Sequence, residues 1–278
     1  RWDAALTILE AELERVEKYT LLAARPAVIG LIAAIRSALG EVEIARTLFE
    51  EAEALYRAAG DVEGARLSLL ESVRILAETG ALDRARSAVD SLEATLESEL
   101  RPQPLLQAQL MRVDASLSAL EGDYDGAVTS AEAGCALLCE AEQELSHGGL
   151  QLVSVKAAIR SGYENQLAPS PGIEAQVRQL LAAAVRLDAP LLQITARIAL
   201  ADVLWSKGST EAASVQVAQA LKEAQLLTFL DGVAQALESQ ARIQSDRELA
   251  LRAIQTYRSL GCIRRAERVE DEWSEETL

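Results

Sequence analysis

A short motif, glycine followed five residues later by alanine, recurs along the chain. Its four copies begin at Gly40, Gly80, Gly122 and Gly208, so the gaps are 40, 42 and 86 residues, and the last gap is close to two periods. Self-similarity at a period of about 20–50 residues is typical of solenoids and other repeat folds. The chain is therefore expected to consist of repeated units of about forty residues.

A second repeated stretch lies half a period away from the first. The pattern Tyr-Arg-x-x-Gly at Tyr56 to Gly60 recurs at Tyr257 to Gly261, and it marks the join between one unit and the next. A degenerate unit is expected between the third and fourth glycines, where Pro169 breaks the chain before a new amphipathic run.

Each unit contains two stretches with helical periodicity. Residues 41–59 place apolar side chains at spacings of three and four and charged side chains between them, which indicates a helix exposed on one side. Residues 27–40 carry one charge, Arg36, and are otherwise apolar nearly all round, so such a helix must be covered by neighbours. Pro26 near its start and Gly40 at its end suit a helix start and a helix end.

These patterns predict an all-α protein, a right-handed α-solenoid of about seven antiparallel helix pairs in a single domain over residues 1–278. About fourteen helices are expected, with the mostly apolar first helix of each pair inside and the charged second helix outside. The repeat units are placed at roughly 1–18, 19–60, 61–101, 102–144, 145–188, 189–227 and 228–261, with a capping helix at 262–278.

The spacing of small residues in one unit resembles the tetratricopeptide (TPR) repeat family. Ala33, Gly40, Ala45, Phe49 and Ala52 stand at the family's positions for small, turn and aromatic residues. The period here is nearer forty than thirty-four residues, and the proline that usually closes a repeat is absent. Long repeats of this type look like the repeat arms of bacterial signal-transduction ATPases and transcription activators. The resemblance implies a concave groove lined by the first helices.

Charge and composition exclude several classes of function. The formal net charge is −16 and the pI is near 4.6, so the chain as a whole would be repelled by nucleic acid and by anionic membranes. We therefore expect no direct nucleic-acid partner and no membrane partner. Three cysteines, too few for a disulfide scaffold, favour a reducing, cytoplasmic location.

The N-terminus begins inside a repeat. Trp2 and Ala5 align with Tyr124 and Ala127 of a later copy, which places the first helix in the outer half of a hairpin. We therefore predict that the chain is a fragment of a longer protein.

Almost all of the negative charge lies on the predicted outer helices, whereas the inner helices are nearly neutral. One interpretation is a solvated convex face that keeps a repeat protein soluble. The alternative is a basic stripe in the groove that meets carboxylates of a peptide or an anionic ligand. The candidates for this stripe are Arg36, Arg74, Arg112, Lys156 and Arg197, with Arg74 and Arg112 the best placed.

Two further residues are candidates for the groove. Trp205 lies one turn before a hairpin glycine on a predicted inner helix, and Asp202 lies three residues earlier. An aromatic side chain beside a polar one can anchor a partner, and packing in the core is the alternative role for Trp205.

The sequence offers little support for catalysis or for a cofactor. Cys135, Cys139 and His147 could suggest a zinc site, but a fourth ligand is missing and buried cysteine behaves as a small apolar residue. Neither a phosphate-binding loop nor a dinucleotide fingerprint occurs. The chain is predicted to be no enzyme and to need no cofactor.

Two terminal or connecting features remain. The stretch 164–171 is the one long insertion, and it is either a tolerated linker or a loop beside a binding face. Trp273 is expected to cover the end of the solenoid.

The function expected from these features is a regulatory module within a larger signalling protein, binding a peptide or protein partner in its groove. Two alternatives stay open: a sensor arm for a small-molecule effector, and a scaffold subunit of an assembly.

Overall fold

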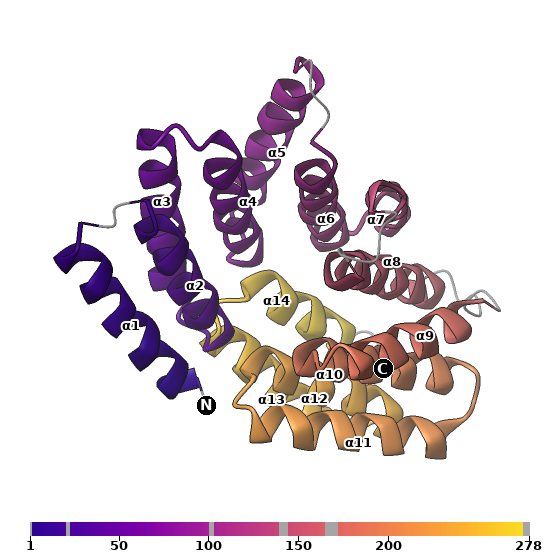
Figure 1. Ribbon diagram of the computed structural model, residues 1–278. Coiled ribbons are helices and arrows are strands. Elements are labelled where there is room, and N and C mark those ends of the chain that lie inside the picture. Colours follow the sequence, from indigo (N-terminus) through magenta and orange to yellow (C-terminus); the bar gives the residue numbers. More distant parts are fainter. Residues whose placement is uncertain (1, 21–22, 100–102, 139–143, 165–171, 275–278) are drawn as a thin grey trace.

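The computed structural model describes residues 2–20, 23–99, 103–138, 144–164 and 172–274. Within these ranges the regular structure is entirely α-helical, which confirms the predicted fold class of an all-helical solenoid (Figure 1). The helices are α1 Trp2–Lys18, α2 Arg25–Ala38, α3 Val42–Ala58, α4 Val62–Glu78, α5 Leu82–Glu97, α6 Pro104–Glu121, α7 Tyr124–Leu137, α8 Glu144–Glu164, α9 Ile173–Arg186, α10 Pro190–Ser206, α11 Thr210–Leu226, α12 Leu230–Gln244, α13 Arg247–Ser259 and α14 Ile263–Glu272.

Proline and glycine lie at the ends of several helices, as the sequence predicts for Pro26 and Gly40 at the two ends of α2. Pro104 and Pro190 lie in the first turns of α6 and α10, where the missing N–H removes no helical hydrogen bond. Gly40 and Gly122 follow α2 and α6 with φ of +84° and +89°. Residues with a Cβ atom rarely adopt this left-handed backbone conformation, so glycine is favoured there.

Small residues let paired helices approach closely. Ala33 of α2 and Ala45 and Ala52 of α3 are fully buried, and so are Ala201 of α10 and Ala213 of α11. Larger side chains at these places would push the two helices of a pair apart, because protein interiors are close-packed.

The helices form two layers. The even-numbered helices form the inner layer, and from α4 to α12 each one contacts the next even-numbered helix. The odd-numbered helices lie outside them (Figure 1). Each helix also packs against its neighbours in sequence, so the core is a chain of apolar clusters that follows the solenoid.

The solenoid curves so strongly that its two ends meet (Figure 1). The Trp2 Nε1 atom donates a hydrogen bond of 2.6 Å to the carbonyl oxygen of Leu227, which follows α11. At the same junction Leu260 lies against Gly40, and α14 contacts α4. The described helices therefore form one closed turn.

The closed turn changes the expected role of the last helix. Trp273 packs half-buried against the final core cluster, as expected of a residue at the end of the repeats. However, α14 does not only cap a free end, because it forms part of the inner layer beside α4. The described helices include none with the length and apolar character needed to cross a membrane.

Candidate functional site: a charged central cavity

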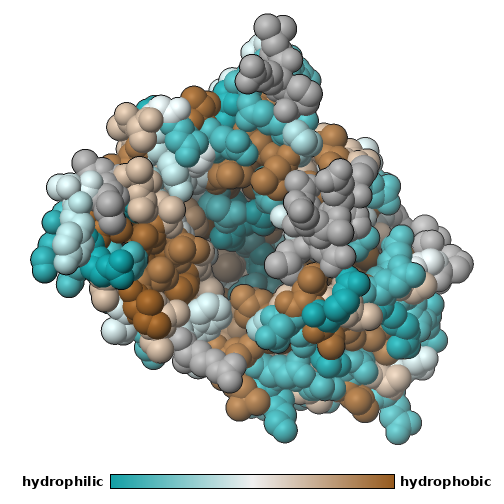
Figure 2. All heavy atoms as spheres, viewed as in Figure 1, coloured by the Kyte–Doolittle hydropathy of each residue, from teal (hydrophilic) through white to brown (hydrophobic). Residues whose placement is uncertain are grey.

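The inner helices surround a cavity of about 230 Å³. Figure 2 shows a hollow at the centre of the molecule with hydrophilic side chains in its floor. Side chains from α4, α6, α7, α8, α10, α12, α13 and α14 line the cavity. Its charged lining residues are Glu78, Lys156, Arg160, Asp202, Glu238, Arg242, Arg265 and Arg268.

The charge of the lining is opposite to that of the chain. Five of the described charged lining residues are cationic and three are carboxylates, whereas the whole chain has a net charge of −16. Inside a cavity these charges are screened less by solvent than charges on the surface. Among the residues that line the cavity, cations therefore outnumber carboxylates by two, in a protein that is acidic as a whole.

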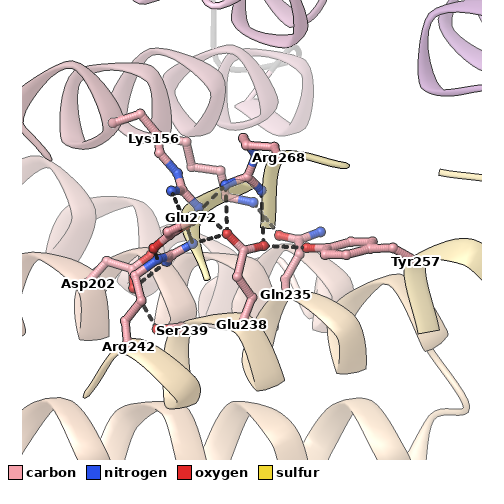
Figure 3. A network of polar contacts seen from close by, with 10 residues as sticks. Lys156, Asp202, Gln235, Glu238, Ser239, Arg242, Tyr257, Arg268 and Glu272 are labelled. Atoms are coloured by element: carbon pink, nitrogen blue, oxygen red, sulfur yellow. Dashed lines mark hydrogen bonds and ion pairs between the residues drawn. The ribbon is translucent and has the colours of Figure 1, made fainter. Parts of the chain in front are cut away.

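Glu238 of α12 is the centre of the polar network (Figure 3). Its carboxylate accepts hydrogen bonds of 2.9 and 3.1 Å from Arg268 and one of 2.8 Å from the Tyr257 hydroxyl. Arg160 and Arg242 also pair with it. Burial alone would raise the pKa of Glu238, but attraction by the three guanidinium groups holds that pKa well below its ordinary value. Glu238 is thus a buried, ionised carboxylate.

Two more carboxylates complete this network. Glu272 accepts a hydrogen bond of 2.5 Å from Arg242 Nε and one of 3.2 Å from Arg160. Asp202 accepts one of 2.5 Å from the Ser239 hydroxyl, and its carboxylate lies 3.9 Å from Arg242. Burial raises the pKa of Asp202 above its ordinary value. All three arginines, Arg160, Arg242 and Arg268, therefore contact Glu238, and Arg160 and Arg242 also share Glu272.

Arg265 joins the last inner helix to two others. One of its amino groups lies 2.7 Å from the Asp231 carboxylate of α12, and another pairs with Glu78 of α4. Burial would lower the pKa of Arg265, but the two carboxylates raise it well above its ordinary value. Through this side chain, α14 is tied across the closure of the turn to a helix 187 residues earlier in the sequence.

Lys156 projects from α8 towards this network (Figure 3). Its Nζ donates a hydrogen bond of 2.5 Å to Oε1 of Gln235, and the Gln235 amide nitrogen donates one of 2.5 Å to Asp231. Burial, followed by repulsion from Arg265, lowers the pKa of Lys156 to about 8. The ammonium group is therefore held at the cavity by a neutral partner.

Four of the seven predicted groove residues lie on the inner side of the turn. Lys156 and Asp202 line the cavity. Arg74 of α4 and Arg112 of α6 lie close together, because both pair with Glu71 at 2.9 and 2.6 Å. Burial would raise the pKa of Glu71, but these two arginines lower it to about 2. The expected basic stripe is thus neutralised at this point by a carboxylate.

The other three predicted residues lie away from the cavity. Arg36 forms ion pairs of 3.2 and 2.7 Å with Glu10 of α1 and with Glu41, which precedes α3. Arg197 lies 3.4 Å from Glu223 of the outer helix α11. Trp205 packs half-buried against the apolar core between α8 and α12. Arg36 and Arg197 are therefore turned towards outer helices and do not join the predicted basic stripe.

The described residues do not form the zinc site that Cys135, Cys139 and His147 could suggest. Cys139 lies outside the described residues, and so does the stretch 165–171, which forms most of the predicted insertion. Cys135 is half-buried, and burial, followed by repulsion from Glu132, raises the pKa of its thiol to about 11. Within the described part of the chain, no group of three or more His, Cys, Asp or Glu side chains could hold a metal ion.

Most of the network was missed from the sequence. Glu238 and Arg242, one helical turn apart on an inner helix, had the same signal as Lys156, namely charge on a helix that must be covered. Arg265 and Arg268 lie in the stretch that the sequence predicts to be a capping helix, so their place in the inner layer could not be foreseen.

Comparisons with known proteins give no family. No family model matches the chain, and no curated protein matches it. Among solved structures it is similar to BtubC (BKLC) from P. vanneervenii, with 13% identity and a TM-score of 0.47 over 99% of this chain and 93% of that one.

Proposed function

We propose that this chain is a non-catalytic regulatory module that binds a small molecule in its central cavity. The observation that carries the proposal is the closure of the inner layer around a cavity of about 230 Å³ whose largely apolar lining carries several charged groups. Apolar walls combined with a few convergent polar groups are the usual features of small-molecule sites.

The shape of the inner face favours this role over the binding of a peptide in an open groove. The two ends of the turn meet at Leu227 and at Gly40, and Arg265 crosses the closure. The remaining space suits a compact molecule, whereas an extended peptide needs an open channel along several repeats. Binding of a peptide or a protein partner, and a scaffold role, stay predictions from the sequence.

The contacts of the cavity carboxylates favour a regulatory role over a catalytic one. The carboxylates Glu238 and Asp202 are held by arginine or by Ser239, so neither is a free general base. A ligand that contacts α8, α12 and α14 together would change how tightly the turn closes. Such a change is a means of passing a binding signal along a solenoid, whose repeats contact mainly their neighbours.

A thermal-shift screen of the chain against a broad panel of metabolites tests the proposal. A compound that binds only the folded form raises the melting temperature. Replacing Ser116, which lines the cavity, by phenylalanine (S116F) should fill the space and abolish the shift. The matched control is Ser91→Phe on the exposed face of α5, which should keep it.

Two results would count against small-molecule binding in the cavity. One is the absence of any shift across the panel. The other is a compound that shifts S116F and S91F equally, because that compound would bind elsewhere.

A further inference from the structure

The cavity carries two cationic side chains on one face of α8. Lys156 and Arg160 are four residues apart, so they lie one above the other on the helix, and both line the cavity. Facing them are Arg265 and Arg268 of α14. Cationic groups from two inner helices therefore converge on the same space.

Lys156 has no carboxylate partner among the described residues. Its Nζ contacts the amide oxygen of Gln235, a neutral group, at 2.5 Å. A buried ammonium group normally pairs with an anion, because removal from water costs several kcal/mol. Burial, followed by repulsion from Arg265, lowers the pKa of Lys156 to about 8. The ammonium group is thus available to an incoming anion.

Arg160 shares both of its carboxylate partners with other arginines. It pairs with Glu238 and Glu272, but Arg242 and Arg268 pair with the same Glu238 carboxylate. Burial, and then repulsion from those two arginines, lowers the pKa of Arg160. An additional anion near α8 would relieve this repulsion without breaking an existing pair.

We propose that the ligand of the cavity is a compact dianion, a phosphate or a small dicarboxylate, bound with Lys156 as its main charge partner. This inference rests on the proposed function and names the chemical class of its ligand. Charge-assisted hydrogen bonds from ammonium and guanidinium groups are the strong contacts for carboxylates and phosphates. A nucleic acid carries the same groups but is repelled by the acidic surface of the chain.

Calorimetric titration of the chain tests the ligand class. The probes are inorganic phosphate and succinate, with neutral succinamide and sodium chloride at equal ionic strength as controls. We expect at least one dianion to bind and both controls to give no saturable heat. Binding of phosphate alone would identify a phosphate ligand, and binding of succinate alone would identify a dicarboxylate ligand.

Three variants test the role of Lys156. Lys156→Gln removes the charge but can still donate to Gln235, and it should weaken the dianion at least tenfold, whereas Lys156→Arg should restore binding to within about threefold. The matched control, Lys207→Gln, removes a lysine that pairs with Glu174 away from the cavity and should change little. Circular dichroism melts confirm that each variant is folded.

The inference is overturned if neither dianion binds, or if Lys156→Gln binds as tightly as the unaltered chain. A different outcome would overturn the dianion and leave the proposed function intact. A neutral metabolite that stabilises S91F but not S116F, together with no binding of either dianion, would leave a small-molecule cavity standing and remove the dianion.

Discussion

The ion pairs of Arg46 on the outer helix α3 and those of Arg160 and Arg265 on the inner helices differ in what they connect. On the outer helix α3, Arg46 lies 2.9 Å from Glu43 and 2.5 Å from Glu50, so both pairs stay within about one helical turn. On the inner helices, Arg160 pairs with Glu238, 78 residues away, and Arg265 pairs with a residue 187 positions away. The pairs of Arg46 therefore stay within one helix, whereas those of Arg160 and Arg265 join helices that are far apart in the sequence.

Loss of the shared inner carboxylate should have the greatest effect. Glu238→Gln leaves Arg160, Arg242 and Arg268 in a buried site with less negative charge. Breaking a buried pair by removing one partner typically costs about 3–5 kcal/mol, so we expect the free energy of unfolding to fall by about 3 kcal/mol. Urea denaturation measures this change. An unchanged midpoint would mean that the network does not stabilise the fold.

Loss of the arginine that crosses the closure should come next. Arg265→Met removes the pairs with Glu78 and Asp231 while keeping much of the side-chain volume. We expect a loss of roughly 2 kcal/mol and faster hydrogen exchange in α4 and α14, since those helices lose their link. Arg264→Met, whose ion pair with Glu267 stays within α14, is the control. Equal exchange in the two variants would speak against a closed turn.

Acid should weaken the pair formed by α4 and α6. The pKa of Glu71 is about 2 in the folded protein, below its ordinary value of 4.5. Because the folded pKa is depressed, the stabilisation is present above pH 4.5 and is lost as the pH falls from 4.5 towards 2. Glu71→Gln should remove this part of the pH dependence, worth roughly 1–2 kcal/mol. Thermal melts of both proteins between pH 5 and 2.5 measure it, and parallel curves would refute the assignment.

Loss of an outer carboxylate should have the smallest effect. The Glu43 side chain is 69% exposed, and Arg46 keeps Glu50 as a partner. Exposed pairs contribute about 0–1 kcal/mol, so Glu43→Gln should change the free energy of unfolding by less than about 0.5 kcal/mol. A loss comparable to that of Glu238→Gln would erase the distinction between outer and inner pairs.

The fold could be predicted because its determinants are local. Gly40 with its positive φ, Pro104 in a first turn and Ala45 at a close helix contact each act within one hairpin, and the hairpin repeats. The curvature of the whole solenoid cannot be predicted from the sequence of any single repeat. It follows from small rotations between units, and those rotations decide whether distant helices meet.

The site was predicted only in part for the same reason. Lys156 was found because cations are few on the apolar inner helices, and Asp202 because it lies three residues before Trp205. Arg36 and Arg197 meet the same criterion but are rotated towards outer helices, which spacing alone did not resolve. Arg265 was missed because its partner Glu78 lies on the other side of the closure.

A double-mutant cycle between Glu78 and Arg265 tests whether inner charges hold the turn closed. The free energy of unfolding is measured for Glu78→Gln, Arg265→Met and the double variant. The closed turn predicts a coupling energy of about 1–2 kcal/mol, since residues in one ion-pair network typically couple by about 0.5–3 kcal/mol. A coupling below about 0.3 kcal/mol would show that α4 and α14 do not meet in solution and would contradict the closed turn.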